Sequence, residues 1–406
     1  MKTSKIGSAS HRRSVLTIAA ISLLGPWLSN DAAAQSQRPL KIGVVAGLSG
    51  PFASTGQDVV DGLRLASDLY GEVLGQKIQL IVEDSAGNPD QAVTKAIKLV
   101  ERDEVVAIIG LTFSGETLAV QAISERLRVP LITTNAAANQ ITGQNRTPWI
   151  FRTIPNDSFS ANALSKYMEA NPALKNGTWY IVGHDIAYGR SIAEAAKKTG
   201  IRVVGESFWP MSTFDWAPSL SRIQKEKPDF ILMGTAVGTP FLQFIKQAND
   251  FGVLKSVKIV APIGVADNVV TELGTLAEGI LVVGQWAAWT FEDRSPELKK
   301  FNEAFAARHK RVPPFQAISS AAGLQVLVAA INEAKSSNPE AIRKAMAGIS
   351  ASTLIGKIQI RAADHQALAP LFSGRYVRLQ QPRYGANVAL QIESVIPGID
   401  VANPAQ

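Results

Sequence analysis

The chain has 406 residues, of which 46% are hydrophobic and 18% are charged. This composition excludes a disordered chain, and the length predicts two or three globular units at about 100–200 residues each. The formal net charge is +7, but the basic residues are scattered without a run of five, so we expect no nucleic-acid partner.

The first 34 residues have the pattern of a secretory signal. Four basic residues precede a mostly apolar run of 14 residues, 15–28, and Ala32 and Ala34 occupy the small positions of an A-x-A cleavage site. We expect cleavage after about Ala34 and a periplasmic protein of net charge +4. An arginine pair at 12–13 also partly resembles a twin-arginine signal, so the sequence leaves the export route open. A buried N-terminal helix is the alternative interpretation.

The next part of the chain alternates short apolar runs with amphipathic ones. The apolar runs are rich in Ile and Val and do not alternate strictly, which is typical of parallel strands buried on both faces. We predict strands at 41–46, 77–83, 105–110 and 129–134, and helices at 57–70, 90–102 and 115–126. This order predicts a doubly wound α/β unit.

The same pattern restarts after residues 151–157, which predicts a second α/β lobe of similar size. Its expected strands are 178–183, 201–209, 229–234, 257–262 and 278–284, and its expected helices are 158–169, 189–199, 218–225 and 240–251. Further helices are expected at 296–309, 319–333 and 339–347, and further strands at 356–360, 375–380 and 387–392. The short connections between the lobes favour a hinge.

Three turns rich in hydroxyl groups follow predicted strands of the first lobe. They span 47–56, 108–117 and 131–140, and each precedes a polar or helical segment. The first lacks the lysine of a phosphate-binding loop and the glycine spacing of a dinucleotide site, which argues against a nucleotide. Because the carboxyl ends of parallel strands meet at one edge, the turns predict a crevice whose backbone N–H groups hold a carboxylate. Simple helix capping is the alternative.

Enzyme chemistry has little support in this sequence. There are four histidines and no cysteine, and neither HExxH nor GxSxG occurs. We therefore expect no catalytic residue, no bound metal and no cofactor.

Several segments together resemble a known family. KIGVVAGLSGPFASTGQDVVDGLRLA, IIGLTFSGET, LITTNAAA and GHDIAYGRSIAEAAKKTG look like the periplasmic substrate-binding proteins of branched-chain amino-acid ABC importers, the leucine-binding-protein-like type I periplasmic binding proteins. The resemblance implies two doubly wound α/β lobes joined by a three-segment hinge. Lobe 1 would comprise 38–154 and 286–372, and lobe 2 would comprise 155–285 and 373–396. It also implies a non-catalytic monomer that closes on a small carboxylate ligand and docks on membrane permease subunits.

The resemblance also implies where the ligand binds. The family's carboxylate and ammonium are held by a serine after the third strand, here Ser114, and by groups after the fourth, here Asn135, Ala136 and Ala137. Ala137 stands at the position where the family has a threonine, so the hydrogen-bond donor of that hydroxyl is absent here. Tyr188 matches the tyrosine that covers the ligand from the second lobe.

Two departures from the family pattern bear on the ligand. Ile263 stands at the position where the family has an acidic residue that pairs with the ammonium. The position of the family's second tyrosine falls near Ala236 in this chain. Because a buried ammonium without an anion costs several kcal/mol, we predict an organic acid without an α-ammonium, a class that includes aromatic acids. Asp267 or Glu292 could replace the missing anion, which keeps amino acids open.

Aromatic residues of both lobes complete the predicted site. Phe113, Trp286 and Trp289 could line an aromatic chamber, although hinge packing is the alternative for both tryptophans. Arg64 or Arg152 could assist the carboxylate. The predicted ligand-binding residues are Thr55, Phe113, Ser114, Asn135, Ala136, Ala137, Tyr188, Ile263 and Trp286. The alternative functions are a ligand-sensing module of the same fold for a signalling partner, and a secreted α/β enzyme.

Overall fold

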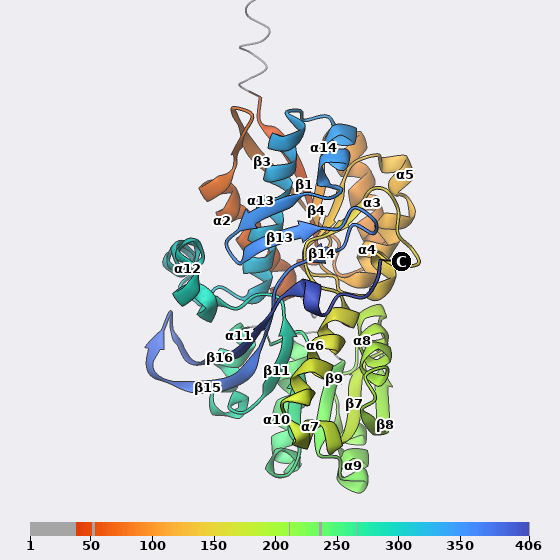
Figure 1. Cartoon of the computed structure of the whole chain (residues 1–406), viewed down its shortest axis with the longest axis vertical. Helices are drawn as coiled ribbons and strands as arrows, with labels where there is room; N and C mark the ends of the chain where they lie inside the picture. Colours follow the sequence, from red (N-terminus) through yellow and green to blue (C-terminus); the bar gives the residue numbers. More distant parts are fainter. Residues whose placement is uncertain (1–37, 51–52, 211, 235–237, 266, 406) are drawn as a thin grey trace, which may run out of the picture. The chain divides into compact units, whose positions relative to one another are not determined.

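The computed structural model describes residues 38–50, 53–210, 212–234, 238–265 and 267–405. The predicted signal segment 1–34 and Ala236 lie outside the described residues. The protein has two α/β lobes, each built around its own sheet (Figure 1).

The first sheet has six strands in the order β2-β3-β1-β4-β5-β6. All neighbours pair in parallel except β2 and β3, which form an antiparallel hairpin. The strands are β1 (Leu40–Ala46), β2 (Glu72–Val73), β3 (Gln76–Asp84), β4 (Ile108–Gly110), β5 (Leu131–Thr133) and β6 (Ile150–Arg152).

Helices cover both faces of this sheet. Val44 packs into a core with residues of α2 and α13, whereas its neighbour Val45 packs on the other face with residues of α3 and α4. Gly62 of α2 permits a close approach to α13, because a Cβ there would lie 2.3 Å from the Ala317 carbonyl oxygen. These helices are α2 (Ala53–Tyr70), α3 (Pro89–Glu101), α4 (Ser114–Ala122), α5 (Ser124–Leu127) and α13 (Phe315–Ala334).

The second sheet has seven strands in the order β16-β15-β11-β10-β9-β7-β8. The five strands from β11 to β8 are parallel, and the two C-terminal strands are added antiparallel at the β11 edge (Figure 1). The strands are β7 (Thr178–His184), β8 (Arg202–Trp209), β9 (Phe230–Gly234), β10 (Lys258–Ala261), β11 (Leu281–Gln285), β15 (Leu371–Arg383) and β16 (Ala386–Ile396).

This sheet is also buried on both faces. Ile181 and Leu232 pack with residues of α6 and α8, and Val182 and Met233 pack on the opposite face with residues of α9 and α10. The helices are α6 (Asp157–Glu169), α7 (Pro172–Asn176), α8 (Ala187–Lys197), α9 (Ala217–Glu226), α10 (Thr239–Asp250) and α11 (Asp267–Leu273).

The remaining elements cover the first lobe, connect the two lobes or, as η2 and η3 do, pack within the second lobe. They are the small sheet of β12 (Ser350–Thr353), β13 (Gly356–Ile360) and β14 (Ala367–Leu368), the helices α12 (Pro296–His309) and α14 (Pro339–Met346), and the 3-10 helices η1 (Asn139–Ile141), η2 (Val253–Lys255), η3 (Gly274–Ala277), η4 (Trp289–Arg294) and η5 (Gly398–Asp400).

Helix α13 is the only helix in the described part of the chain that is long and apolar enough to cross a membrane. Its 20 residues have a mean hydropathy of 1.4, but 83% of the apolar window is buried inside the protein. Because α13 packs along α2 on the first sheet, its apolar character serves the core of that lobe.

The strand orders of both sheets place a switch point at a central strand. In the first sheet the chain leaves β1 for β3 on one side and returns to β4 on the other side. In the second sheet β8 and β9 flank β7 in the same way. Ligands of open α/β sheets bind in the crevice outside the carboxyl ends of strands at such points.

Candidate functional site

A cavity of about 260 Å³ lies at the carboxyl ends of both sheets, between the lobes. Of the nine predicted ligand-binding residues, every one except Ala136 lines this cavity. The lining residues are Thr55, Gly87, Pro89, Thr112, Phe113, Ser114, Gly115, Glu116, Asn135, Ala137, Ile186, Ala187, Tyr188, Ile263, Trp286, Phe315 and Gln316.

The start of α4 presents polar groups to the cavity. Ser114 is the first residue of the helix, so its amide and those of Gly115 and Glu116 have no intrahelical acceptor. The Ser114 hydroxyl oxygen accepts the Ala138 N–H at 3.2 Å, which leaves the hydroxyl hydrogen available to a ligand. An anion in the cavity would also interact favourably with the positive end of the helix dipole.

Other side chains of the first lobe reach the cavity with unused hydrogen-bonding capacity. The hydroxyl oxygens of Thr55 and Thr112 and the amide oxygen of Asn135 are buried and have no partner among the described residues. The Asn135 amide nitrogen donates to the hydroxyls of Thr134 and Ser320 at 3.0 and 3.1 Å, which fixes the side chain. Such groups cost free energy until a ligand or water satisfies them.

The prediction that Ala136 contacts the ligand is not supported by its position. Its amide donates to the Thr133 hydroxyl at 3.0 Å, and its carbonyl oxygen accepts from Arg152 at 3.3 Å. These bonds turn the Ala136 backbone away from the cavity. Arg152 itself is fully buried and also donates to Ala138 and Gln366, at 2.8 and 2.7 Å, so it shapes the loop without lining the cavity.

The second lobe contributes an apolar wall. Ile186, Ala187 and Ile263 line the cavity, and the Tyr188 hydroxyl has no partner among the described residues. Burial, followed by the nearby charge of Asp157, raises the pKa of Tyr188 well above its usual value, so its hydroxyl stays neutral. Ile263 leaves this wall without a carboxylate.

Residues that the sequence analysis missed complete the chamber. Trp286 lies edge-on to Phe315, with ring centroids 5.7 Å apart and planes at 82°. The next residue, Gln316, is 1% exposed, and neither its amide oxygen nor its amide nitrogen has a partner among the described residues. The sequence predicts this helix only from Ser319, whereas α13 begins at Phe315, after the extended Pro314.

Among the described residues Glu116 is the only acidic residue in the lining of the cavity, and no Lys, Arg or His belongs to that lining. The Ser85 hydroxyl donates to one carboxyl oxygen at 2.5 Å, and the Phe113 N–H points at the other at 3.3 Å. Burial raises the pKa of Glu116 to about 7. A glutamate at the third position of a helix is common because it caps the helix start. The sequence therefore carries no signal that Glu116 lies beside the cavity.

The carboxylates that were predicted to replace the missing anion lie elsewhere. Asp267 accepts the indole N–H of Trp289 at 2.9 Å, and neither residue lines the cavity. Glu292 is buried and accepts from Asn302 and Tyr384. Trp289 therefore packs in the connection between lobes, as the alternative interpretation proposed.

The lobes contact each other beside the cavity. The Asn139 N–H of the first lobe donates to the Ser191 hydroxyl of α8 at 3.1 Å. Residues of both lobes, such as Phe315 and Tyr188, also belong to one continuous apolar cluster. The cavity therefore lies between lobes that contact each other.

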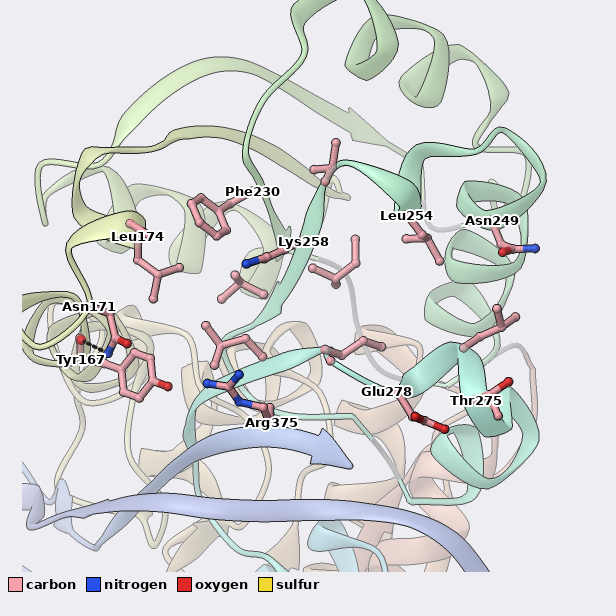
Figure 2. Close-up of a pocket in the computed structure, with 18 of the residues that line it drawn as sticks. Tyr167, Asn171, Leu174, Phe230, Asn249, Leu254, Lys258, Thr275, Glu278 and Arg375 are labelled. Carbon is pink, nitrogen blue, oxygen red and sulfur yellow. Dashed lines mark hydrogen bonds between the residues drawn. The ribbon is translucent and has the colours of Figure 1, made fainter. Parts of the chain in front are cut away.

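A second cavity of about 580 Å³ lies at the opposite edge of the second sheet, near the starts of β9, β10 and β11 (Figure 2). Figure 2 shows Leu174, Phe230 and Leu254 on its walls, with Lys258 and Arg375 among the charged residues that border it. It is larger, but none of the unpartnered buried side-chain atoms of the described residues belongs to its lining. The interlobe cavity therefore has the better-defined chemistry. Within the described ranges no group of acidic or histidine side chains could hold a metal ion.

Known proteins resemble this chain in sequence and in structure. Residues 39–380 match a family model described as periplasmic binding protein. The Leu/Ile/Val-binding protein BraC3 of Rhizobium johnstonii is 30% identical over 329 residues, which cover 79% of this chain and 86% of BraC3.

Two solved structures illustrate the likeness of fold. The solute-binding protein of an ABC transporter from Rhodopseudomonas palustris, in complex with 3,4-dihydroxybenzoic acid, superposes with a TM-score of 0.79 at 23% identity, covering 89% of this chain and 98% of that chain. The leucine-binding protein LivK of Thermotoga maritima superposes with a TM-score of 0.76 at 22% identity, covering 89% of this chain and 99% of LivK.

Proposed function

We propose that this chain, which belongs to the periplasmic binding protein family, is the solute-binding component of an ABC importer. It closes on a small carboxylate ligand and delivers it to permease subunits in the membrane. The family implies a transport protein located in the periplasm, and we propose that it acts as a monomer without catalytic activity. The same fold serving as a sensor for a signalling partner is the alternative.

The observation that carries this proposal is the interlobe cavity with its unused donors. Amides at the start of α4 and the hydroxyls of Ser114, Thr55 and Thr112 all line one wall. These neutral donors suit a carboxylate, which can accept several hydrogen bonds at once. No cation from the described residues lines the cavity, so helix amides and hydroxyls supply the attraction.

The rest of the cavity favours an aromatic acid. Phe113, Tyr188, Trp286 and Phe315 line it together with Ile263, and aromatic rings pack favourably against such walls. The wall from the second lobe offers no anion for an α-ammonium. The complex of the Rhodopseudomonas protein with 3,4-dihydroxybenzoic acid supports the same ligand class.

An amino acid is the second candidate ligand, favoured by two observations. The Rhizobium relative is a Leu/Ile/Val-binding protein. In addition, the acidic residue Glu116 belongs to the cavity lining, although on the first lobe, and its ionised form would attract an ammonium.

The proposed mechanism is a shift between open and closed forms. We propose that lobe 1 comprises 38–154 and 286–372 and that lobe 2 comprises 155–285 and 373–396. Because a ligand contacts Ser114 and Tyr188 together only when the lobes are closed, binding favours closure by its differential affinity. The three connections between the lobes would form the hinge.

Titration calorimetry with benzoate, 4-hydroxybenzoate and leucine tests the ligand class. We expect at least one aromatic acid to bind and leucine to bind at least about tenfold more weakly, because a buried ammonium without an anion is costly. Tight leucine binding without aromatic-acid binding would contradict the aromatic proposal. Binding of none of these carboxylates would contradict the proposed function.

Two substitutions test the position of the site. Ser114→Ala and Tyr188→Ala should each weaken acid binding about tenfold or more, since each removes a buried hydrogen-bond or packing partner. Ser124→Ala, which removes a hydroxyl bonded to Thr147 outside the cavity, is the matched control and should leave affinity unchanged. Unchanged affinity in both site variants would contradict this placement.

A further inference from the structure

Glu116 is in an unusual position for a site that receives an anion. The residue is 0% exposed and belongs to the lining of the cavity, within one helical turn of the amides that are proposed to hold the carboxylate. Its two hydrogen-bond partners, the Ser85 hydroxyl and the Phe113 amide, are neutral. Among the described residues no cation forms an ion pair with it.

The elements packed around α4 do not supply a compensating cation. From β3, Asp84 adds a second negative charge near Glu116. The cations on the neighbouring α3, α5 and α8 already have carboxylate partners. These pairs are Lys95 and Lys98 with Glu83, Arg126 with Glu101, Arg190 with Asp185, and Lys197 with Glu194 and Glu206. The acidic residues Asp90 on α3 and Glu125 on α5 add no positive charge, η1 carries no titratable side chain, and Tyr188 of α8 stays neutral.

The cavity is too small to separate two negative charges. At about 260 Å³ it would be about 8 Å across if it were spherical, so a carboxylate anywhere inside lies within several ångströms of Glu116. Buried charges are screened less than exposed ones, so the repulsion between the two carboxylates favours a complex in which one of them is neutral.

We propose that Glu116 takes up one proton when the protein binds its carboxylate ligand, so that the ligand is captured as an anion together with a proton. The inference rests on the proposed function, because it requires a carboxylate in this cavity. The proton comes from solvent and resides on a carboxyl oxygen of Glu116, and no covalent bond to the ligand is made or broken.

The direction of the pH dependence follows from linkage. Burial already raises the pKa of Glu116 to about 7 in the free protein, and a bound anion raises the pKa further. Below about pH 7 both forms hold the proton, and affinity is constant. Between the free and the bound pKa, affinity falls by up to about tenfold per pH unit, and above the bound pKa it levels off again.

Calorimetry measures the proton directly. Benzoate is titrated into the full mature protein from pH 6 to 8.5 in buffers of different ionisation enthalpy, where a carboxylic acid of ordinary pKa stays ionised. We expect an uptake that approaches one proton per benzoate near pH 8 and affinity that falls over the same range. Binding of benzoate without proton uptake would overturn the inference while leaving the proposed function intact.

The substitution Glu116→Gln assigns the proton to a residue. Glutamine can also cap the start of α4, so the fold should be retained. We expect the variant to bind benzoate with no proton uptake and with affinity independent of pH from 6 to 8.5. Glu101→Gln, which changes an exposed glutamate of α3, is the matched control and should behave as the wild type does.

Two further outcomes would overturn the inference. Uptake that persists in Glu116→Gln would place the proton on another group. Leucine binding that needs Glu116 and takes up no proton would show an ionised Glu116 that pairs with an ammonium. If neither benzoate nor 4-hydroxybenzoate nor leucine binds the wild type, the proposed function fails instead, and the wild-type titration alone reveals this.

Discussion

Gln316 is a single residue at which the demands of stability and of the proposed ligand site conflict. Its side chain is 1% exposed, and both polar atoms of the amide lack partners among the described residues. A buried amide without hydrogen bonds costs about 1–3 kcal/mol. Its place in the cavity wall beside Phe315 gives a physical reason for tolerating that cost, because a bound ligand can satisfy the amide.

The substitution Gln316→Leu should therefore separate stability from binding. We expect the free protein to become more stable by about 1 kcal/mol, since the unsatisfied amide is removed, and acid binding to weaken about tenfold. Denaturant unfolding and calorimetry measure the two effects. The control is Gln121→Leu, because the Gln121 amide donates to the Ile141 carbonyl at 2.9 Å, so its loss should destabilise the protein. A less stable Gln316→Leu protein would contradict the argument.

The sequence could identify only part of this site. Ser114 and Tyr188 lie in motifs that match the family, so their positions could be predicted, and the cavity contains both. Glu116 and Gln316 could not be predicted as cavity residues. Each lies near the start of a helix, and only the packing of that helix in the folded protein places it beside the cavity. Ala136 lies between two lining residues in the sequence. Its carbonyl oxygen nevertheless accepts a hydrogen bond from Arg152, and the residue does not line the cavity.

At the scale of elements, apolar runs and helix periodicity predicted most strands and helices to within a few residues. The predicted helix 115–126 is instead two helices, because the chain departs from helical geometry at Ile123, between α4 and α5. Strand β6 has only three residues and lies in a segment that the sequence analysis treated as a junction. A strand this short has too little periodicity to be distinguished from a loop.

Arg152 connects β6 to the loop that lines the cavity after β5. The fully buried guanidinium donates to Ala138, Gln366 and Thr142, and thus holds together segments that are distant in the sequence. Burial lowers the pKa of Arg152 to about 9, so it remains charged at neutral pH. Two backbone hydrogen bonds also hold this loop, because the Thr134 N–H donates to the Gly110 carbonyl oxygen at 3.2 Å and the Asp157 N–H donates to the Ala137 carbonyl oxygen at 3.0 Å. Arg152 adds contacts that reach as far along the chain as Gln366.

The substitution Arg152→Met should loosen this loop. Several buried acceptors would lose their donor, and we expect a loss of about 3 kcal/mol in the free energy of unfolding. The exposed ion pair of Arg126 with Glu101 offers a control, since Arg126→Met should cost less than about 1 kcal/mol. Equal stability losses in the two variants, measured by denaturant unfolding, would contradict the proposed role of Arg152.

At the scale of the whole molecule, the two switch points face one cavity. Each sheet alone offers an incomplete site: the first supplies the amides and hydroxyls, and the second supplies the apolar cover that includes Tyr188 and Ile263. The lobes also contact each other directly, through the hydrogen bond from Asn139 to Ser191 and through apolar residues of one continuous cluster. A ligand that contacts both walls adds to these contacts in the closed form and so shifts the equilibrium towards closure.

Fluorescence transfer between the lobes tests this mechanism. The chain contains no cysteine, so Lys344→Cys on lobe 1 and Lys225→Cys on lobe 2, both at exposed positions, can be labelled without background. Without ligand we expect a mixture of open and closed forms, and with saturating benzoate a shift of the transfer efficiency to a single value. The ligand can shift the populations only by its differential affinity for the two forms, so the shift should track occupancy of the site.

The Tyr188→Ala variant of the same labelled protein should need more benzoate for the same shift, because its second lobe offers less contact. A transfer efficiency that does not respond to saturating benzoate would contradict closure as the mechanism even if benzoate binds.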